Sequence, residues 1–71
     1  MVLEYNLLSG FGVEFRVYDQ SGKEVKYYNE KFKKPGNNTF NFITTPFPNG
    51  IYLIKLLAGP YSEVRKMVVI H

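Results

Sequence analysis

The last third of the sequence constrains the fold most, because it contains two long apolar segments around a short turn. Residues 50–57 and 62–70 are rich in Ile, Val and Leu, and residues 58–61 between them include a Gly-Pro pair. Aliphatic and β-branched runs of this length, bounded by Gly and Pro, are typical of β-strands. This segment therefore predicts a β-hairpin on which the rest of the chain packs.

The first strand of this hairpin is apolar on both of its faces. The residues of one face are Tyr52, Ile54 and Leu56, and those of the other are Ile51, Leu53 and Leu57, with Lys55 among them. A strand that is apolar on both faces is typical of the middle of a covered sheet. We therefore expect this strand to be central, and either covered on both sides or in contact with a partner.

The second strand, residues 62–70, has no purely apolar face. Val64 and Val68 alternate in phase with Lys66, whereas Met67 and Val69 share the other face with charged residues. A bulge next to Lys66 would allow Val64 and then Met67 and Val69 to face the core. Otherwise Met67 and Val69 cover a second surface, where a partner could bind. The pattern leaves both arrangements open.

The first two thirds of the chain predict shorter strands, each with a two-residue alternation. Apolar and polar residues alternate over residues 3–7, 13–18, 25–28 and 39–43. The apolar positions are Leu3, Tyr5, Leu7, Val13, Phe15, Val17, Val25, Tyr27, Phe40 and Phe42. This period indicates half-buried strands that turn one face toward a core.

Turn sequences separate these strands. The Asp19 side chain can accept a hydrogen bond from its own turn, and Gly22 tolerates a positive φ. Pro35 lies in a polar connection and cannot donate to a sheet ladder. Two prolines and an Asn-Gly pair within residues 44–50 predict an ordered bend in which Phe47 packs as a plug.

The length and the strand pattern together predict a single small domain. A chain of 71 residues forms one domain, and a core of this size rarely supplies more than roughly 3–5 kcal/mol. Short strands, Gly/Pro/Asn turns and no helical period favour an all-β fold. We expect a small immunoglobulin-like antiparallel β-sandwich of about six to seven strands.

Residues that could carry catalysis are sparse. The chain has one Asp, one His and no Cys, whereas nucleophilic catalysis needs three groups within hydrogen-bond reach. We expect Asp19 to serve its turn and His71 to be a frayed end. No metal-ligand spacing and no phosphate-binding loop occurs. The sequence therefore predicts that the domain is not an enzyme and has no catalytic, cofactor or metal site.

Lysines gather between residues 23 and 34, with three aromatic residues among them. Lysines and rings together can bind single-stranded nucleic acid, but two glutamates interrupt this run and it contains no Arg. Lysines also discourage edge-to-edge pairing of strands. We favour the edge-strand interpretation and expect no nucleic-acid partner.

Three segments, in order, resemble the motifs of the type A C-terminal sorting domains of the type IX secretion system. Residues 17–25 (VYDQSGKEV) resemble the family's hydrophobic-Tyr-Asp-x-x-Gly-basic-x-Val hairpin. Residues 49–56 (NGIYLIKL) are similar to its Gly-hydrophobic-Tyr strand, and residues 65–70 (RKMVVI) resemble its basic-then-aliphatic ending. Residues 3–7 also fit its first strand. The resemblance extends over nearly the whole chain.

The resemblance implies a sorting signal without catalysis of its own. Residues 1–71 would be the C-terminal sorting domain of a larger exported protein, which reaches the cell surface or is secreted through the periplasm and the outer membrane. The implied partners are outer-membrane translocon components and a sortase-like surface peptidase. Two alternatives are open: a structural capping domain, or a carbohydrate- or surface-binding module with an exposed aromatic row at Tyr18, Tyr28 and Tyr61.

The resemblance also suggests which residues the export machinery recognises. An edge or terminal strand can pair with a strand of a receptor through its main chain, and the hairpin supplies such a strand. The candidate recognition residues are Gly50, Gly59, Lys66, Met67, Val68 and Val69. The competing interpretation is that the glycines serve turns and the aliphatic residues form core. An exposed edge strand could also support a weak homodimer.

Overall fold

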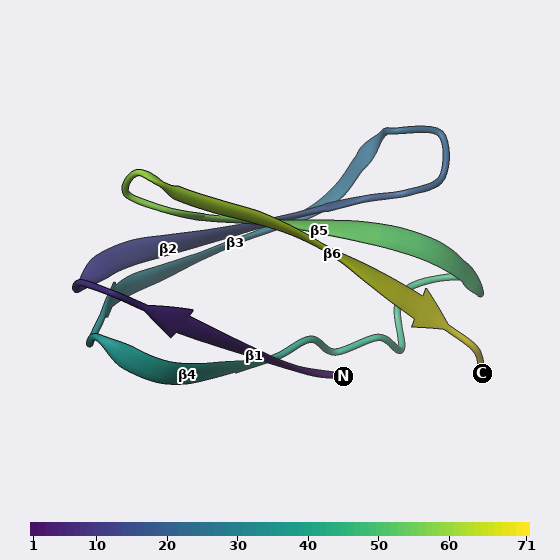
Figure 1. The fold of residues 1–71 in the computed structure, drawn as a ribbon. Helices are drawn as coiled ribbons and strands as arrows, with labels where there is room; N and C mark the ends of the chain where they lie inside the picture. Colours follow the sequence, from purple (N-terminus) through teal and green to yellow (C-terminus); the bar gives the residue numbers. More distant parts are fainter.

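The computed structural model describes residues 1–71 as two antiparallel β-sheets that pack face to face (Figure 1). The six strands are β1 (Val2–Leu7), β2 (Phe11–Tyr18), β3 (Glu24–Lys33), β4 (Gly36–Asn41), β5 (Gly50–Ala58) and β6 (Tyr61–Val69). β1 and β4 form the small sheet, and the large sheet has the order β3-β2-β5-β6. The expected all-β sandwich is confirmed.

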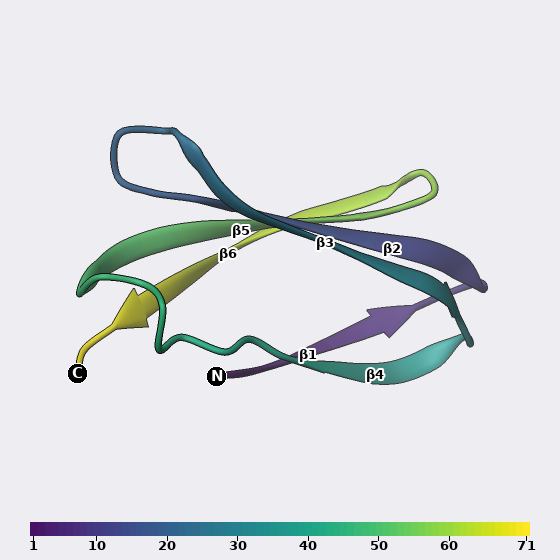
Figure 2. The same cartoon turned by 180° about the vertical axis from the view of Figure 1, so that it is seen from behind.

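The strand order matches the immunoglobulin topology. In that fold one sheet contains strands B and E, and the other contains G, F and C, with C′ added in variable-type domains. β1 and β4 occupy the positions of B and E, and β3-β2-β5-β6 corresponds to C′-C-F-G. Figure 2 shows from behind how β1 and β4 lie beneath the large sheet. The hairpin that dominates the sequence thus supplies half of the large sheet.

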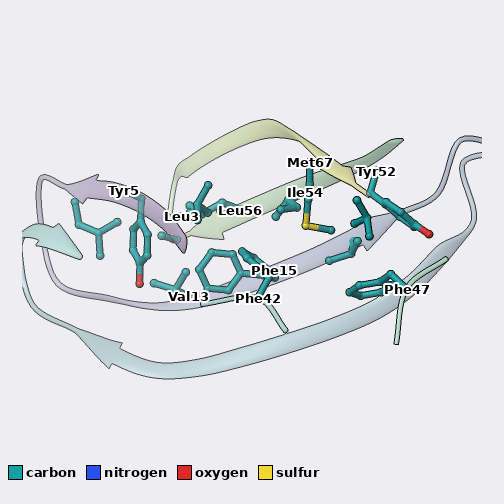
Figure 3. Close-up of a cluster of buried hydrophobic side chains, with 14 residues drawn as sticks. Leu3, Tyr5, Val13, Phe15, Phe42, Phe47, Tyr52, Ile54, Leu56 and Met67 are labelled. Carbon is teal, nitrogen blue, oxygen red and sulfur yellow. The ribbon is translucent and has the colours of Figure 1, made fainter. Parts of the chain in front are cut away.

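The core lies between the two sheets and is mostly aromatic and aliphatic (Figure 3). Phe15 of β2 is fully buried at its centre, with its ring stacked 4.5 Å from Phe40. The rings of Tyr5 and Phe42 meet Phe15 edge-on, at 5.6 and 5.4 Å. Such pairs add about 0.5–1.5 kcal/mol each beyond the area that they bury. The high aromatic content therefore compensates for the small number of core residues.

The loop between β4 and β5 covers the part of the large sheet that the small sheet leaves open. Phe47 in this loop is buried, and its ring lies 5.3 Å from that of Tyr52 (Figure 3). The Tyr52 hydroxyl donates to the Pro48 carbonyl oxygen at 2.6 Å, which fixes the loop on β5. The expected plug is confirmed.

The β5–β6 hairpin has an uninterrupted register, so neither arrangement expected for β6 is correct. Its pairs run without a shift from Gly50↔Val69 to Ala58↔Tyr61. Met67 and Val69 point into the core and are almost fully buried. The charged residues of the same face, Glu63 and Arg65, form an ion pair and are half-buried, because β6 is the edge of the sheet.

The return strand β3 has the opposite phase from the one expected from the sequence. Tyr28 faces the core opposite Phe15, whereas Val25 and Tyr27 are exposed. The cause is a register shift near Val17 and Tyr18, which inserts one extra residue into β3. Because both neighbours at positions 27 and 28 are tyrosines, the apolar pattern could not determine which one turns inward.

The role expected of Asp19 in the β2–β3 turn is confirmed, whereas the frayed end expected at His71 is wrong. The Asp19 carboxylate accepts hydrogen bonds from the Ser21 N–H and hydroxyl and from the Lys23 N–H, at 2.9, 2.6 and 3.0 Å. Gly22 has a φ of 86°, as the turn requires. His71 is not frayed: its N–H donates to Asn49 Oδ1 at 2.9 Å, and its Nε2 lies 2.7 Å from the Phe47 carbonyl oxygen.

Candidate recognition surface

The outer face of the large sheet, which points away from the small sheet, is aliphatic over β5 and β6. Alternation along β5 turns every residue between the core positions outward, and the unbroken register does the same on β6. Four side chains form what we call the aliphatic patch: Ile51, Leu53, Val64 and Val68, exposed by 38%, 46%, 58% and 55%. Cross-strand pairing places Val68 opposite Ile51.

Basic residues lie within this surface and have no acidic partner. Lys66 of β6 is opposite Leu53, and Lys55 of β5 is opposite Val64 on one side and Arg16 on the other. The salt bridges of the chain are Arg16–Glu24, Lys33–Glu30 and Arg65–Glu63. Neither Lys55 nor Lys66 belongs to one. The β5–β6 part of the outer face thus combines exposed aliphatic side chains with unpaired positive charge.

The four candidate recognition residues of β6 divide into two groups in the structure. Lys66 and Val68 are exposed on the outer face, and with Val64 they form a set that we call the β6 triplet. Met67 and Val69 are 1% and 3% exposed and belong to the core. These two side chains can therefore affect a partner only through the fold.

The two glycines lie at the ends of β5 and also serve the fold. Gly50 begins β5 opposite Val69. Gly59 has a φ of 59°, and a Cβ at this position would lie 2.4 Å from a ring atom of Phe11. Only glycine fits this turn without strain and without displacing the ring.

Three residues of the outer face were missed as recognition candidates: Ile51, Leu53 and Val64. The signal for them was present, because β5 is apolar on both faces. A strand with that pattern predicts that the outer face is covered. In the structure no other part of the chain packs on the outer face of β5. The first alternative expected for β5, a cover on both sides, is therefore wrong, and the second, contact with a partner, stays a prediction.

The aromatic row expected of a carbohydrate-binding module does not form. Tyr28 faces the core, where its ring lies 5.0 Å from Phe40 and 5.5 Å from Phe42. Tyr18 lies on the outer face opposite Leu53, and Tyr61 lies beside the β5–β6 turn. The three rings belong to different faces and ends of the sandwich, so they offer no common platform for a sugar.

The titratable groups with shifted pKa values do not converge on one site. Burial, with a smaller effect of Glu30, raises the pKa of Tyr5, whose buried hydroxyl has no hydrogen-bond partner. A hydrogen bond to Glu14 raises the pKa of Tyr27, which lies on the outer face of the large sheet. No three His, Cys, Asp or Glu side chains come together as metal ligands would. The chain also forms no helix with the length and apolarity of a transmembrane helix.

These features define a class: a small immunoglobulin-like sandwich with exposed aliphatic side chains and unpaired lysines on the outer face of one sheet. A comparison with family models gives the family. The model of the secretion system C-terminal sorting domain matches residues 2–70, and the chain belongs to this family. No curated protein and no solved structure matched the chain.

Membership in this family establishes what the domain does. It is a sorting signal of the type IX secretion system, which takes an exported protein across the outer membrane to the cell surface or the medium. The domain therefore interacts with the secretion machinery. The family is not known for catalysis.

Proposed function

We propose that residues 1–71 are the last domain of a larger exported protein and that the outer-membrane translocon reads the outer face of β5 and β6. The domain has no catalysis of its own. After export it is the substrate of a sortase-like surface peptidase, which removes it from the cargo. The observation that carries this proposal is the aliphatic patch with its unpaired lysines, on a sheet face that nothing in the chain covers.

The buried candidate residues have an indirect role in this proposal. Lys66 and Val68 contact the translocon directly, together with Ile51, Leu53 and Val64. Met67 and Val69 hold β6 against the core, and Gly50 and Gly59 allow β5 to begin and to turn. Substitutions of the buried residues should therefore reduce export in proportion to lost stability, whereas substitutions of exposed residues should reduce export at unchanged stability.

The experiment uses a reporter protein that is delivered to the periplasm of a host with a type IX secretion system. Residues 1–71 are fused after the reporter in one variant, and between the reporter and a second folded domain in another. We expect surface delivery only when the sorting domain is last. Equal delivery of both fusions would contradict the terminal position, and retention of both would contradict the proposed function.

The same strains test the proposed removal of the domain. We expect the exported reporter to be shorter by the mass of the sorting domain in a host with the surface peptidase, and full-length in a host without it. Mass spectrometry of the surface material measures both. Full-length reporter in both hosts would show that the peptidase does not process this domain.

A second copy of the chain is the alternative occupant of the β6 edge. A weak homodimer through this strand would appear in light scattering as a mass that rises with protein concentration. A constant monomer mass up to high concentration would contradict it.

A further inference from the structure

The large sheet has two edge strands, β3 and β6, which differ in how they meet a neighbouring strand. β3 carries Lys26, Lys31 and Lys33, and its pairing with β2 contains two register shifts. Lysines and bulges are devices by which natural sheets block pairing at an edge. β6 has one lysine, no proline and no bulge along its full pairing with β5. The two charged residues on its inner face, Glu63 and Arg65, pair with each other. β6 is therefore the more regular of the two edges and the one more open to an added strand.

The short turn determines which main-chain groups of β6 are free. Ala58 and Tyr61 flank the two-residue turn as a hydrogen-bonded pair, and hydrogen-bonded and non-hydrogen-bonded pairs alternate from there along the ladder. The β6 triplet falls in the non-hydrogen-bonded pairs, so its N–H and C=O groups point away from β5. The side chains of the same triplet lie on the outer face. The β6 triplet can therefore form main-chain hydrogen bonds with a partner strand and contact the same strand through its side chains.

The triplet also specifies the chemistry of the added strand. Residues directly opposite each other in an antiparallel ladder share a face and contact each other. A strand added at β6 would thus place three of its side chains against Val64, Lys66 and Val68. The valines favour aliphatic neighbours, and the unpaired ammonium of Lys66 favours a carboxylate.

A second copy of the chain fits this edge poorly. The two-fold register that places Val64 opposite Val68 of the second copy also places Lys66 opposite Lys66. Like charges directly opposite each other destabilise a strand pair. Charge complementarity therefore favours a different protein over self-association.

We propose that β6 pairs with an extended segment of a protein of the export machinery, in which a carboxylate lies opposite Lys66 and aliphatic side chains lie opposite Val64 and Val68. This proposal rests on the proposed function, because it gives the chemistry by which the same surface is read. Main-chain hydrogen bonds supply affinity in this mode of recognition, and the alternate side chains supply specificity.

The position of the N-terminus leaves the outer face of the large sheet free while a cargo is attached. The Met1 ammonium donates to the Phe42 carbonyl oxygen at 2.9 Å, in the layer of the small sheet. Figure 1 shows the N-terminus on this side of the sandwich, opposite the outer face of the large sheet. A cargo domain that precedes residue 1 therefore joins the chain on the side away from the aliphatic patch.

The first test is binding of a synthetic peptide, TITETIT, whose glutamate is flanked by two isoleucines at the spacing of the triplet. NMR titration of the isolated domain should shift the amides of the β6 triplet and not those of β3. A TITKTIT control should bind about tenfold more weakly, because it replaces an opposite-charge pair by a like-charge pair. Shifts centred on β3, or equal binding of the two peptides, would overturn the proposal, and so would a mass in light scattering that doubles without peptide.

The second test measures export of the reporter fused to residues 1–71. We expect Lys66→Glu to reduce export about tenfold, and the matched charge change Lys31→Glu on the other edge to leave it unchanged. Val64→Pro should reduce export because it removes one free N–H, and Pro is tolerated at an edge where that N–H faces solvent. Val64→Thr keeps the N–H and the shape and should export better than Val64→Pro.

The outcomes separate this proposal from the proposed function. Melting temperatures identify the variants that remain folded, and Lys66→Glu serves as the test if Val64→Pro does not fold. Export of the wild-type fusion together with undiminished export of folded Lys66→Glu would overturn the strand-pairing proposal and leave the sorting function intact. Failure of the wild-type fusion itself would overturn the proposed function.

Discussion

The large sheet is built from two hairpins that share one core but end in different outer surfaces. On the β2–β3 hairpin, Arg16 forms a salt bridge with Glu24 at 2.9 Å and its guanidinium lies 4.7 Å from the centre of the Tyr27 ring. The Tyr27 hydroxyl in turn donates to Glu14. On the β5–β6 hairpin, the corresponding positions hold the aliphatic patch and two lysines without partners.

The turns of the two hairpins differ in the same way. The β2–β3 turn is held by the Asp19 carboxylate, and its strand pairing contains two register shifts. The β5–β6 turn has two residues, and its pairing is regular from end to end. On the first hairpin, Arg16 and Lys33 are paired with glutamates of the same hairpin. The second is regular and leaves apolar side chains exposed on its outer face, which supports the proposal that another molecule binds there.

The largest expected effect compares two neighbouring residues of β5 that face opposite sides. Ile54 is fully buried and Leu53 is 46% exposed. Ile54→Ala should cost about 2–5 kcal/mol, because it leaves a cavity in the core. Leu53→Ala should cost less than about 1 kcal/mol, because solvent already reaches the side chain. Urea unfolding measures both values.

Export of the same two variants sharpens the comparison between the faces. Since a domain of this size has few kcal/mol to lose, Ile54→Ala should be largely unfolded and poorly exported. Leu53→Ala should be folded and still exported less than wild type, because it removes part of the aliphatic patch. A large loss of stability in Leu53→Ala would mean that the outer face contributes to the fold and that no partner is needed to explain it.

A smaller effect distinguishes the two turns. Gly59 and Gly22 both have positive φ, 59° and 86°, but a Cβ at Gly59 would meet the Phe11 ring, whereas one at Gly22 would meet nothing within 4 Å. Gly22→Ala should cost about 1 kcal/mol of backbone strain, and Gly59→Ala the same strain plus the displacement of the ring, together about 2–3 kcal/mol. Thermal unfolding of both variants measures the difference. Equal costs would show that Phe11 moves aside freely.

Much of the fold follows from residue alternation, and the exceptions have local causes. The inward faces of β1 and β2 were predictable, because apolar and polar residues alternate there, and β5 was predictable as a central strand, because it is long and aliphatic. The phase of β3 was not, since adjacent tyrosines at positions 27 and 28 make both phases equally apolar. A one-residue shift in register, which no composition reveals, then decided which ring is buried.

The candidate surface was predictable only in part. The mixed faces of β6 gave no means of deciding that Met67 and Val69 are core while Val64 is not. That choice depends on the edge position of β6, where Glu63 and Arg65 remain half-exposed on the inner face. The sequence did show that the outer face of β5 is apolar. The pairing of β5 with β6 was needed to show that this face is exposed and that Lys66 and Val68 lie next to it.

The smallest expected effect concerns acid and belongs to the β2–β3 turn alone. Hydrogen bonds from the Ser21 hydroxyl and the Lys23 N–H lower the pKa of Asp19 below its ordinary value. Because the folded-state pKa is the lower one, the stabilisation is fully present above the unfolded-state value, about 3.9, and disappears as the pH falls through the folded-state pKa. We therefore expect Asp19→Asn to lower the melting temperature near neutral pH.

The difference between Asp19→Asn and wild type should close as the pH falls through the folded-state pKa of Asp19, below which the wild-type carboxyl is also neutral. Melting curves between pH 7 and pH 2 measure this convergence, and a gap that stays constant with pH would show that the charge of Asp19 does not hold the turn. Export should change little, since the turn lies outside the aliphatic patch. If Asp19→Asn instead abolished export at unchanged stability, the surface that the machinery reads would lie on the first hairpin, and the contrast between the two hairpins would be reversed.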